Sequence, residues 1–300
     1  MNGISKSAYP SLSALKAFAW LILLGFMAAA HAENIQQLLP DGKTLNAEYR
    51  PGDTRRPAIL VLPGFLQTHE FTATLSIINN TASQGYTILG PNLSLGISDR
   101  HQSMQCEAPH KHTFENDLKE IDFWVKWLLK KGHASVIIVG HSWGSQHGIG
   151  YVDAYPEASV SAVIAISLVR NREDAKTLSR QITESKARVA HHDRSLQPYA
   201  LSFCKTFMAT PQSYLSYAHW DDHHVVGTLV RLQARKFPVY VVLGSEDNRS
   251  DDDWVQTVRR YATQVTVIKG ANHFFSSVHE FDLSDRIETI LTELHAPASK

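Results

Sequence analysis

The chain of 300 residues carries 29 basic and 29 acidic side chains, and 43% of its residues are hydrophobic. This apolar content excludes an intrinsically disordered protein, and the length is sufficient for one domain with a full hydrophobic core. Balanced charge without a cluster of Lys or Arg gives no sign of nucleic-acid binding. We therefore expect a globular protein without a nucleic-acid partner.

The start of the chain differs in composition from the rest. An apolar run, AFAWLILLGFMAAA at 17–30, follows two lysines and leads into an A-x-A sequence, and no acidic residue occurs before Glu33. This pattern is typical of a secretory signal peptide. The run is shorter than the roughly 20 residues that a membrane-spanning helix needs, and an uncleaved anchor is the alternative. We expect a signal peptide at 1–32 and a secreted or periplasmic domain at 33–300, without a stable membrane span after cleavage.

Export gives the two cysteines, Cys106 and Cys204, a possible structural meaning. In an oxidising compartment an isolated pair of cysteines is a candidate disulfide. The sequence does not show whether their Cα atoms lie close enough to be bridged, so two unpaired thiols are the alternative.

Apolar segments rich in β-branched residues alternate with amphipathic segments along the chain. Taken in order, we expect a strand at 57–65, a helix at 70–85, a strand at 86–93, a helix at 113–132, a strand at 134–142, a helix from about 143, strands at 161–169 and 237–245, a helix at 251–262, a strand at 264–271 and a last helix at roughly 281–294. Near-continuous apolar strands that alternate with helices predict an α/β fold with a mostly parallel central sheet flanked by helices. Such a sheet carries its functional residues at the carboxyl ends of its strands.

The segment from about 170 to 235 interrupts this alternation. It is polar, rich in Arg, His and Ser, and contains no clear buried strand. We interpret it as a helical insertion between two strands. In a sheet of this kind such an insertion lies over the strand ends and can form a cap.

The main candidate for chemistry is the segment Gly140-His141-Ser142-Trp143-Gly144, which fits the pattern G-x-S-x-G. A buried strand is expected to run into Ser142 and a helix to leave directly after it. A nucleophile elbow requires this setting, and the two glycines leave room for its sharp turn. The free N–H groups at the start of the helix also favour developing negative charge. We therefore predict that Ser142 is a nucleophile.

A serine nucleophile needs a base, and the base needs an acid to orient it. His273 follows the last predicted strand and is the predicted base, with a solvated loop histidine as the alternative interpretation. Asp247 follows the strand at 237–245 and is the predicted acid, with Glu246 as the first alternative. The acidic residues at 251–253 are more typical of a helix cap and first turn.

The same reaction needs main-chain N–H donors for the oxyanion, each of which contributes roughly 3–4 kcal/mol. We expect one donor at Trp143, directly after the nucleophile, and the other at Phe65, in the loop after an early strand. Gly64 would let the backbone of this loop approach closely. The side chain of Phe65 is equally compatible with a place in the core or in a pocket, because only its main chain is needed.

With these residues in the order Ser, Asp, His, the chain resembles the α/β-hydrolase superfamily over most of 55–295. The resemblance implies the α/β-hydrolase fold and an exported serine hydrolase of esterase or lipase type, which acts on a small-molecule acyl substrate without a cofactor. The sequence Pro63-Gly64-Phe65 replaces the His-Gly or His-Gly-Gly-Gly of many esterases of this fold, which argues against those lipase subgroups. Haloalkane dehalogenases and epoxide hydrolases of this fold place Asp where this chain has Ser142.

A carboxylic ester is the default substrate, and thioesters, amides and acyl transfer are alternatives on the same triad. A binding protein that kept the fold and lost the chemistry is an alternative of another class. Grouped histidines occur at 110 and 112, 191 and 192, and 223 and 224, but no H-E-x-x-H or comparable zinc-ligand spacing is present. We therefore expect no metal site. These histidines are either solvated or part of a polar substrate entrance.

Overall fold

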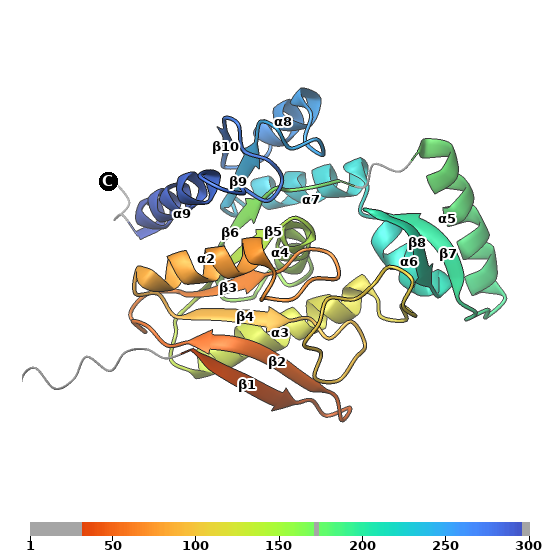
Figure 1. Cartoon of the computed structure of the whole chain (residues 1–300), viewed down its shortest axis with the longest axis horizontal. Helices are drawn as coiled ribbons and strands as arrows, with labels where there is room; N and C mark the ends of the chain where they lie inside the picture. Colours follow the sequence, from red (N-terminus) through yellow and green to blue (C-terminus); the bar gives the residue numbers. More distant parts are fainter. Residues whose placement is uncertain (1–31, 171–173, 296–300) are drawn as a thin grey trace, which may run out of the picture. The chain divides into compact units, whose positions relative to one another are not determined.

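The computed structural model describes residues 32–170 and 174–295 (Figure 1). Residues 1–31, on which the signal-peptide prediction rests, lie outside the described residues. Within the described ranges, no helix is both long and apolar enough to cross a membrane.

An eight-stranded sheet forms the centre of the fold, with strand order β1-β2-β4-β3-β5-β6-β9-β10. The strands are β1 (Glu33–Leu38), β2 (Thr44–Arg50), β3 (Ala58–Leu62), β4 (Ile88–Asn92), β5 (Val136–His141), β6 (Val160–Ile166), β9 (Val239–Gly244) and β10 (Gln264–Ile268). From β4 to β10 all pairings are parallel, whereas β2 pairs antiparallel with both β1 and β4. The predicted α/β fold with a mostly parallel sheet is confirmed.

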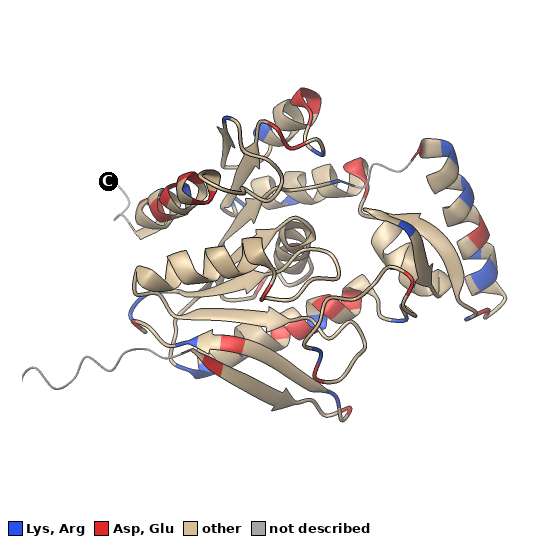
Figure 2. Ribbon diagram, in the orientation of Figure 1, with Lys and Arg blue, Asp and Glu red and all other residues tan. Residues whose placement is uncertain are grey.

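Apolar side chains cover both faces of the parallel strands. On β3, Ile59 and Val61 face one hydrophobic cluster, and Leu60 and Leu62 face the other. Helices α2 (Thr72–Ser83) and α9 (His279–His295) pack on the first face, and α3 (Phe114–Lys130) and α4 (Trp143–Ala154) pack on the second (Figure 1). The six strands of the central sheet that follow β2 in the chain, namely β3, β4, β5, β6, β9 and β10, carry no Lys, Arg, Asp or Glu (Figure 2). The strands β3, β4, β5 and β9 are buried along their whole length, and this burial on both faces explains why the sequence predicted them correctly.

The antiparallel strands β1 and β2 were not predicted. The sequence of β1, ENIQQL, is mostly polar, and its side chains alternate between exposed and half-buried positions. As an edge strand of the sheet it buries little apolar surface, so its sequence lacks the hydrophobic run on which the prediction of the other strands depended.

The insertion differs in part from the all-helical segment expected over 170–235. It contains α5 (Ala175–Ala190), α6 (Pro211–Ala218) and α7 (Asp222–Ala234), but also a β-hairpin of β7 (Gln197–Leu201) and β8 (Cys204–Ala209). The hairpin is too short, and too interrupted by polar residues, to read as a buried strand. Helix α7 packs against α4 and α8 (Asp252–Arg259), so it belongs to the helical layer beside the sheet rather than to a cap.

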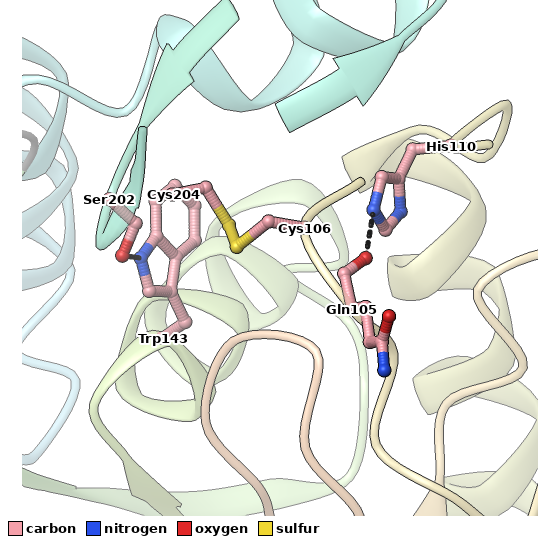
Figure 3. Close-up of a disulfide and its surroundings, with 6 residues drawn as sticks. All are labelled: Gln105, Cys106, His110, Trp143, Ser202 and Cys204. Atoms are coloured by element: carbon pink, nitrogen blue, oxygen red, sulfur yellow. Dashed lines mark hydrogen bonds between the residues drawn. A yellow bond between two sulfur atoms is a disulfide. The ribbon is translucent and has the colours of Figure 1, made fainter. Parts of the chain in front are cut away.

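A disulfide between Cys106 and Cys204 ties the hairpin to the loop before α3, with the two Cα atoms 5.5 Å apart (Figure 3). The same two segments share main-chain hydrogen bonds: the Met208 N–H donates to the Cys106 carbonyl at 2.9 Å, and the His110 N–H donates to the Met208 carbonyl at 2.8 Å. Of the two interpretations that the sequence left open, the structure shows the paired cysteines. The hairpin is thereby held to the body of the fold at one side.

Candidate active site

Ser142 lies at the turn between β5 and α4, in a backbone conformation that L-residues rarely adopt, with φ of 57° and ψ of −121°. The turn is packed against its neighbours. A Cβ atom on Gly140 would lie 2.2 Å from the carbonyl oxygen of Gly144, and one on Gly144 would lie 2.3 Å from that of Leu62. The sharp turn therefore needs glycine at both positions, and it holds the Ser142 side chain at the carboxyl end of β5.

The variant Gly140→Ala is expected to lose about 1–3 kcal/mol of stability, because the new methyl group meets rigid backbone atoms. Denaturant unfolding measures this loss. Gly227→Ala in α7 is the matched control, since its Cβ would meet only the Arg231 side chain at 3.4 Å and alanine favours a helix. Equal stability of the Gly140→Ala variant and the wild type would contradict this account of the turn.

Ser142, His273 and Asp247 form a continuous chain of hydrogen bonds. The Ser142 Oγ lies 3.0 Å from Nε2 of His273, and Nδ1 of the same ring lies 2.8 Å from Oδ2 of Asp247. Each of the three residues is no more than 5% exposed. Glu246, the alternative acid, is exposed. The structure therefore brings together the three side chains that the sequence singled out, with Asp247 rather than Glu246 beside the imidazole.

The loops after β9 and β10 meet closely, which places Asp247 beside His273. A Cβ atom on Gly244 would lie 2.2 Å from the carbonyl oxygen of Ala271, and the Glu246 N–H donates to that same oxygen at 2.9 Å. Two further donors fix the carbonyl of His273: Nε2–H of His141 at 2.9 Å and the Ser167 hydroxyl at 2.8 Å. The backbone position of His273 is thus set by contacts from β5, from the end of β6 and from the β9 loop.

Phe65 and Trp143, the predicted oxyanion donors, lie next to each other above Ser142. Their ring centroids are 5.1 Å apart, and a Cβ atom on Gly64 would lie 3.5 Å from the Cβ of Ser142. Trp143 is the first residue of α4, so its N–H has no acceptor within the helix. Within the described part of the chain, the Phe65 N–H also has no protein acceptor. Both amides belong to backbone segments in contact with the serine, as an oxyanion site requires.

The tip of the β7–β8 hairpin covers this pair. The indole N–H of Trp143 donates to the Ser202 hydroxyl at 3.0 Å, beside the disulfide (Figure 3). Phe203, half exposed at 50%, packs edge-on against Phe65 with centroids 5.8 Å apart. The hairpin tip therefore covers the side chains of both predicted donor residues and orients the indole of Trp143.

The imidazole of His273 has one acidic and one basic neighbour, Asp247 and Arg249. Burial by itself would raise the pKa of Asp247, but the hydrogen bond and charge of His273 and the neighbouring Arg249 hold this pKa below its usual value. The Arg249 guanidinium lies with Nη1 3.3 Å from Nε2 of His273, and burial lowers the pKa of Arg249. Asp247 is therefore ionised at neutral pH, as the residue that stabilises an imidazolium must be.

The comparisons with known proteins agree with this architecture. A family model described as alpha/beta hydrolase fold matches residues 57–189. The solved α/β hydrolase GrgF from Penicillium sp. sh18 covers 89% of this chain and 100% of its own, at 16% identity and a TM-score of 0.68. The chain has the α/β-hydrolase fold.

Two further solved structures share this α/β-hydrolase fold. Est1E from Butyrivibrio proteoclasticus is 15% identical over 89% of this chain and 99% of its own, with a TM-score of 0.61. E-2-(acetamidomethylene)succinate hydrolase is 18% identical over 87% of this chain and 100% of its own, with a TM-score of 0.56. No curated protein matches the sequence. Similarity at this level of identity establishes the common fold.

Sequence reasoning missed four residues that surround this candidate site: His141, Ser167, Ser202 and Arg249. His141 lies within the G-x-S-x-G segment, and Arg249 lies two positions after Asp247, so proximity in sequence was a usable signal for both. Ser202 belongs to the unpredicted hairpin, and Ser167 carries no motif. Among the described residues, no group of His, Cys, Asp or Glu is arranged to hold a metal ion.

Two buried histidines of this hydrolase fold make its stability depend on pH. Burial lowers the pKa of His141 to about 3 and that of His112 to about 4, from an ordinary value of 6.5. Because the folded-state pKa lies below the unfolded one, stability is fully present above pH 6.5 and is lost as the pH falls towards 4. Each histidine contributes up to about 1.4 kcal/mol per pH unit in this window.

Urea unfolding at several pH values between 7 and 4 measures this loss. His112→Phe keeps an aromatic ring beside Tyr217 and removes one titrating group, so its stability should fall less steeply with pH than that of the wild type. His219→Gln, at an exposed position, is the control and should leave the slope unchanged. The interpretation fails if the slopes of all three proteins are the same.

Proposed function

We propose that this protein is a serine hydrolase that cleaves carboxylic esters through an acyl-enzyme. The observation that carries the proposal is the buried chain of hydrogen bonds from the Ser142 Oγ through the His273 ring to Asp247. A hydroxyl, an imidazole and a carboxylate in this order are the parts that activate a serine for attack on a carbonyl carbon.

In this mechanism the lone pair on Nε2 of His273 takes the proton of Ser142 as the Oγ attacks the ester carbonyl. The negative charge on the carbonyl oxygen is stabilised by the N–H groups of Phe65 and Trp143, and Asp247 stabilises the imidazolium. Nε2–H then protonates the departing alcohol, which leaves an acyl group on Ser142. A water molecule gives a proton to Nε2 of His273 and attacks this acyl-enzyme. The bond from the acyl carbon to the Ser142 Oγ then breaks, and Nε2–H returns its proton to Oγ, which releases the acid and restores the serine.

Hydrolysis of thioesters or amides and acyl transfer to an alcohol would use the same triad and the same oxyanion donors. The name of E-2-(acetamidomethylene)succinate hydrolase supports hydrolysis for this chain too. We further propose that the protein is exported, with a signal peptide at about 1–32. The Cys106–Cys204 disulfide supports this location, because disulfides persist in oxidising compartments.

A fluorophosphonate probe and a series of p-nitrophenyl esters of graded acyl length test the proposal together. Labelling confined to Ser142, abolished in His273→Ala, and ester turnover by the wild type are the expected results. A folded wild type that is neither labelled nor active would instead support a binding protein of the same fold. The ester series also ranks acyl chain lengths, and thioester and anilide analogues with the best acyl group separate the substrate classes.

A further inference from the structure

Arg249 contacts the ring of the predicted base, His273, through its guanidinium. Its main-chain N–H donates to Oδ1 of Asp247 at 2.9 Å, and its guanidinium reaches Nε2 of His273, at 3.3 Å from Nη1. Among the described residues, no carboxylate forms an ion pair with this guanidinium. Arg170, by contrast, is paired with Asp222 and Asp251, each at 2.8 Å. Arg249 is thus a partly buried cation that points at the reacting atoms, and the charge of Asp247 acts on it without a direct ion pair to the guanidinium.

This arrangement places two donors on one acceptor atom. Because Nδ1–H of His273 donates to Asp247, Nε2 carries a single lone pair, which the Ser142 hydroxyl needs at 3.0 Å. The Arg249 guanidinium competes for the same lone pair. Once Nε2 has taken the serine proton, two positively charged donors, this N–H and the guanidinium, face each other without an acceptor between them.

A negatively charged group of the substrate would remove this conflict. It would accept hydrogen bonds from the guanidinium and draw it away from Nε2, and charge-assisted hydrogen bonds of this kind are among the strongest in proteins. The position of Arg249 also indicates which part of the substrate carries the charge. Nε2 is the atom that protonates the departing alcohol, so a cation next to Nε2 lies beside the leaving group rather than beside the acyl chain.

We propose that Arg249 is a specificity-determining residue that binds an anionic group, such as a carboxylate, on the alcohol part of the ester. This inference rests on the proposed ester hydrolysis and narrows its substrate class. Esters with a neutral alcohol leave the guanidinium on Nε2 and react more slowly for that reason.

Three acyl esters test the inference: 4-acetoxybenzoate, with its charge on the leaving group, its neutral methyl ester, and a phenyl hemisuccinate, with its charge on the acyl side. For each enzyme the ratio of kcat/KM between the charged and the neutral acetate is measured. Comparing this ratio between wild type and Arg249→Gln cancels the intrinsic reactivity of the esters. We expect the ratio to fall tenfold to a hundredfold in Arg249→Gln, to recover in part in Arg249→Lys, and to stay as in wild type in Lys269→Gln, which removes an exposed charge.

The outcomes separate the two proposals. Labelling of Arg249→Gln by the fluorophosphonate shows that this variant is folded with a reactive serine. If the wild type hydrolyses the esters and the ratio is the same in Arg249→Gln, the role of Arg249 is wrong and ester hydrolysis stands. If Arg249→Gln lowers turnover of the hemisuccinate, relative to wild type, more than it lowers turnover of 4-acetoxybenzoate, the anionic group does not belong to the alcohol and the inference is overturned. If the wild type hydrolyses none of the esters, both proposals fail.

Discussion

Replacing Ser142 with alanine is expected to lower kcat for ester hydrolysis by about 10⁴-fold or more while KM changes little. The loss is large because no other group takes the place of the nucleophile next to Nε2 of His273. Steady-state kinetics on the best p-nitrophenyl ester measures the effect. A replacement that keeps the fold should leave the unfolding transition close to that of the wild type.

Ser145→Ala, three positions further along α4, is the matched control for this change. Its hydroxyl is buried like that of Ser142 but donates to the carbonyl oxygens of Gly140 and Ile166, at 2.8 Å each, and not to the imidazole. This variant should keep its activity within tenfold of the wild type. Comparable kcat values for the Ser142→Ala variant and the wild type would show that another residue is the nucleophile.

Removing the disulfide by the double change Cys106→Ser and Cys204→Ser is expected to cost about 2–4 kcal/mol of stability. The bridge joins residues separated by 98 positions, so its loss returns much conformational freedom to the unfolded chain. It also releases the hairpin whose Ser202 accepts the indole hydrogen bond of Trp143. KM should therefore rise, because the hairpin that covers Trp143 and Phe65 loses its anchor.

Urea unfolding and ester kinetics of the double variant measure the two effects. Wild type treated with a reductant provides the control, since reduction should lower its stability to that of the variant and should not affect the variant itself. A double variant as stable as the oxidised wild type would show that the main-chain contacts of Cys106 and Met208 suffice to hold the hairpin.

The sequence predicted the parts of this fold that bury apolar residues on both sides. Strands such as β5 (VIIVGH) and β9 (VYVVLG) are nearly continuous runs of apolar residues, and such short runs predict strands that are buried on both faces. The edge strand β1 and the hairpin β7–β8 were not predicted because exposed and half-buried side chains interrupt any run of buried apolar residues in them. Their pairing is decided by contacts with distant segments, and a local pattern does not record such contacts.

The candidate site was predictable in its residues and less so in its surroundings. The positions of Ser142, Asp247 and His273 follow from the ends of strands, which a parallel sheet brings to one edge. The role of Arg249 depends on the direction of a long side chain, and the role of Ser202 depends on how the insertion folds back. Neither can be deduced from spacing, because both arise from tertiary packing between segments far apart in the chain.

The Cys106–Cys204 bond closes a covalent ring that contains Ser142, because the nucleophile lies between the two cysteines in the chain. Asp247 and His273 lie outside this ring. The turn between α5 and β7 belongs to the ring and exposes Arg194, a cleavage point for proteases that cut after basic residues. A chain cut there stays one molecule, since its two pieces remain joined through sulfur, and the segment with the serine cannot diffuse away from the segment with the base.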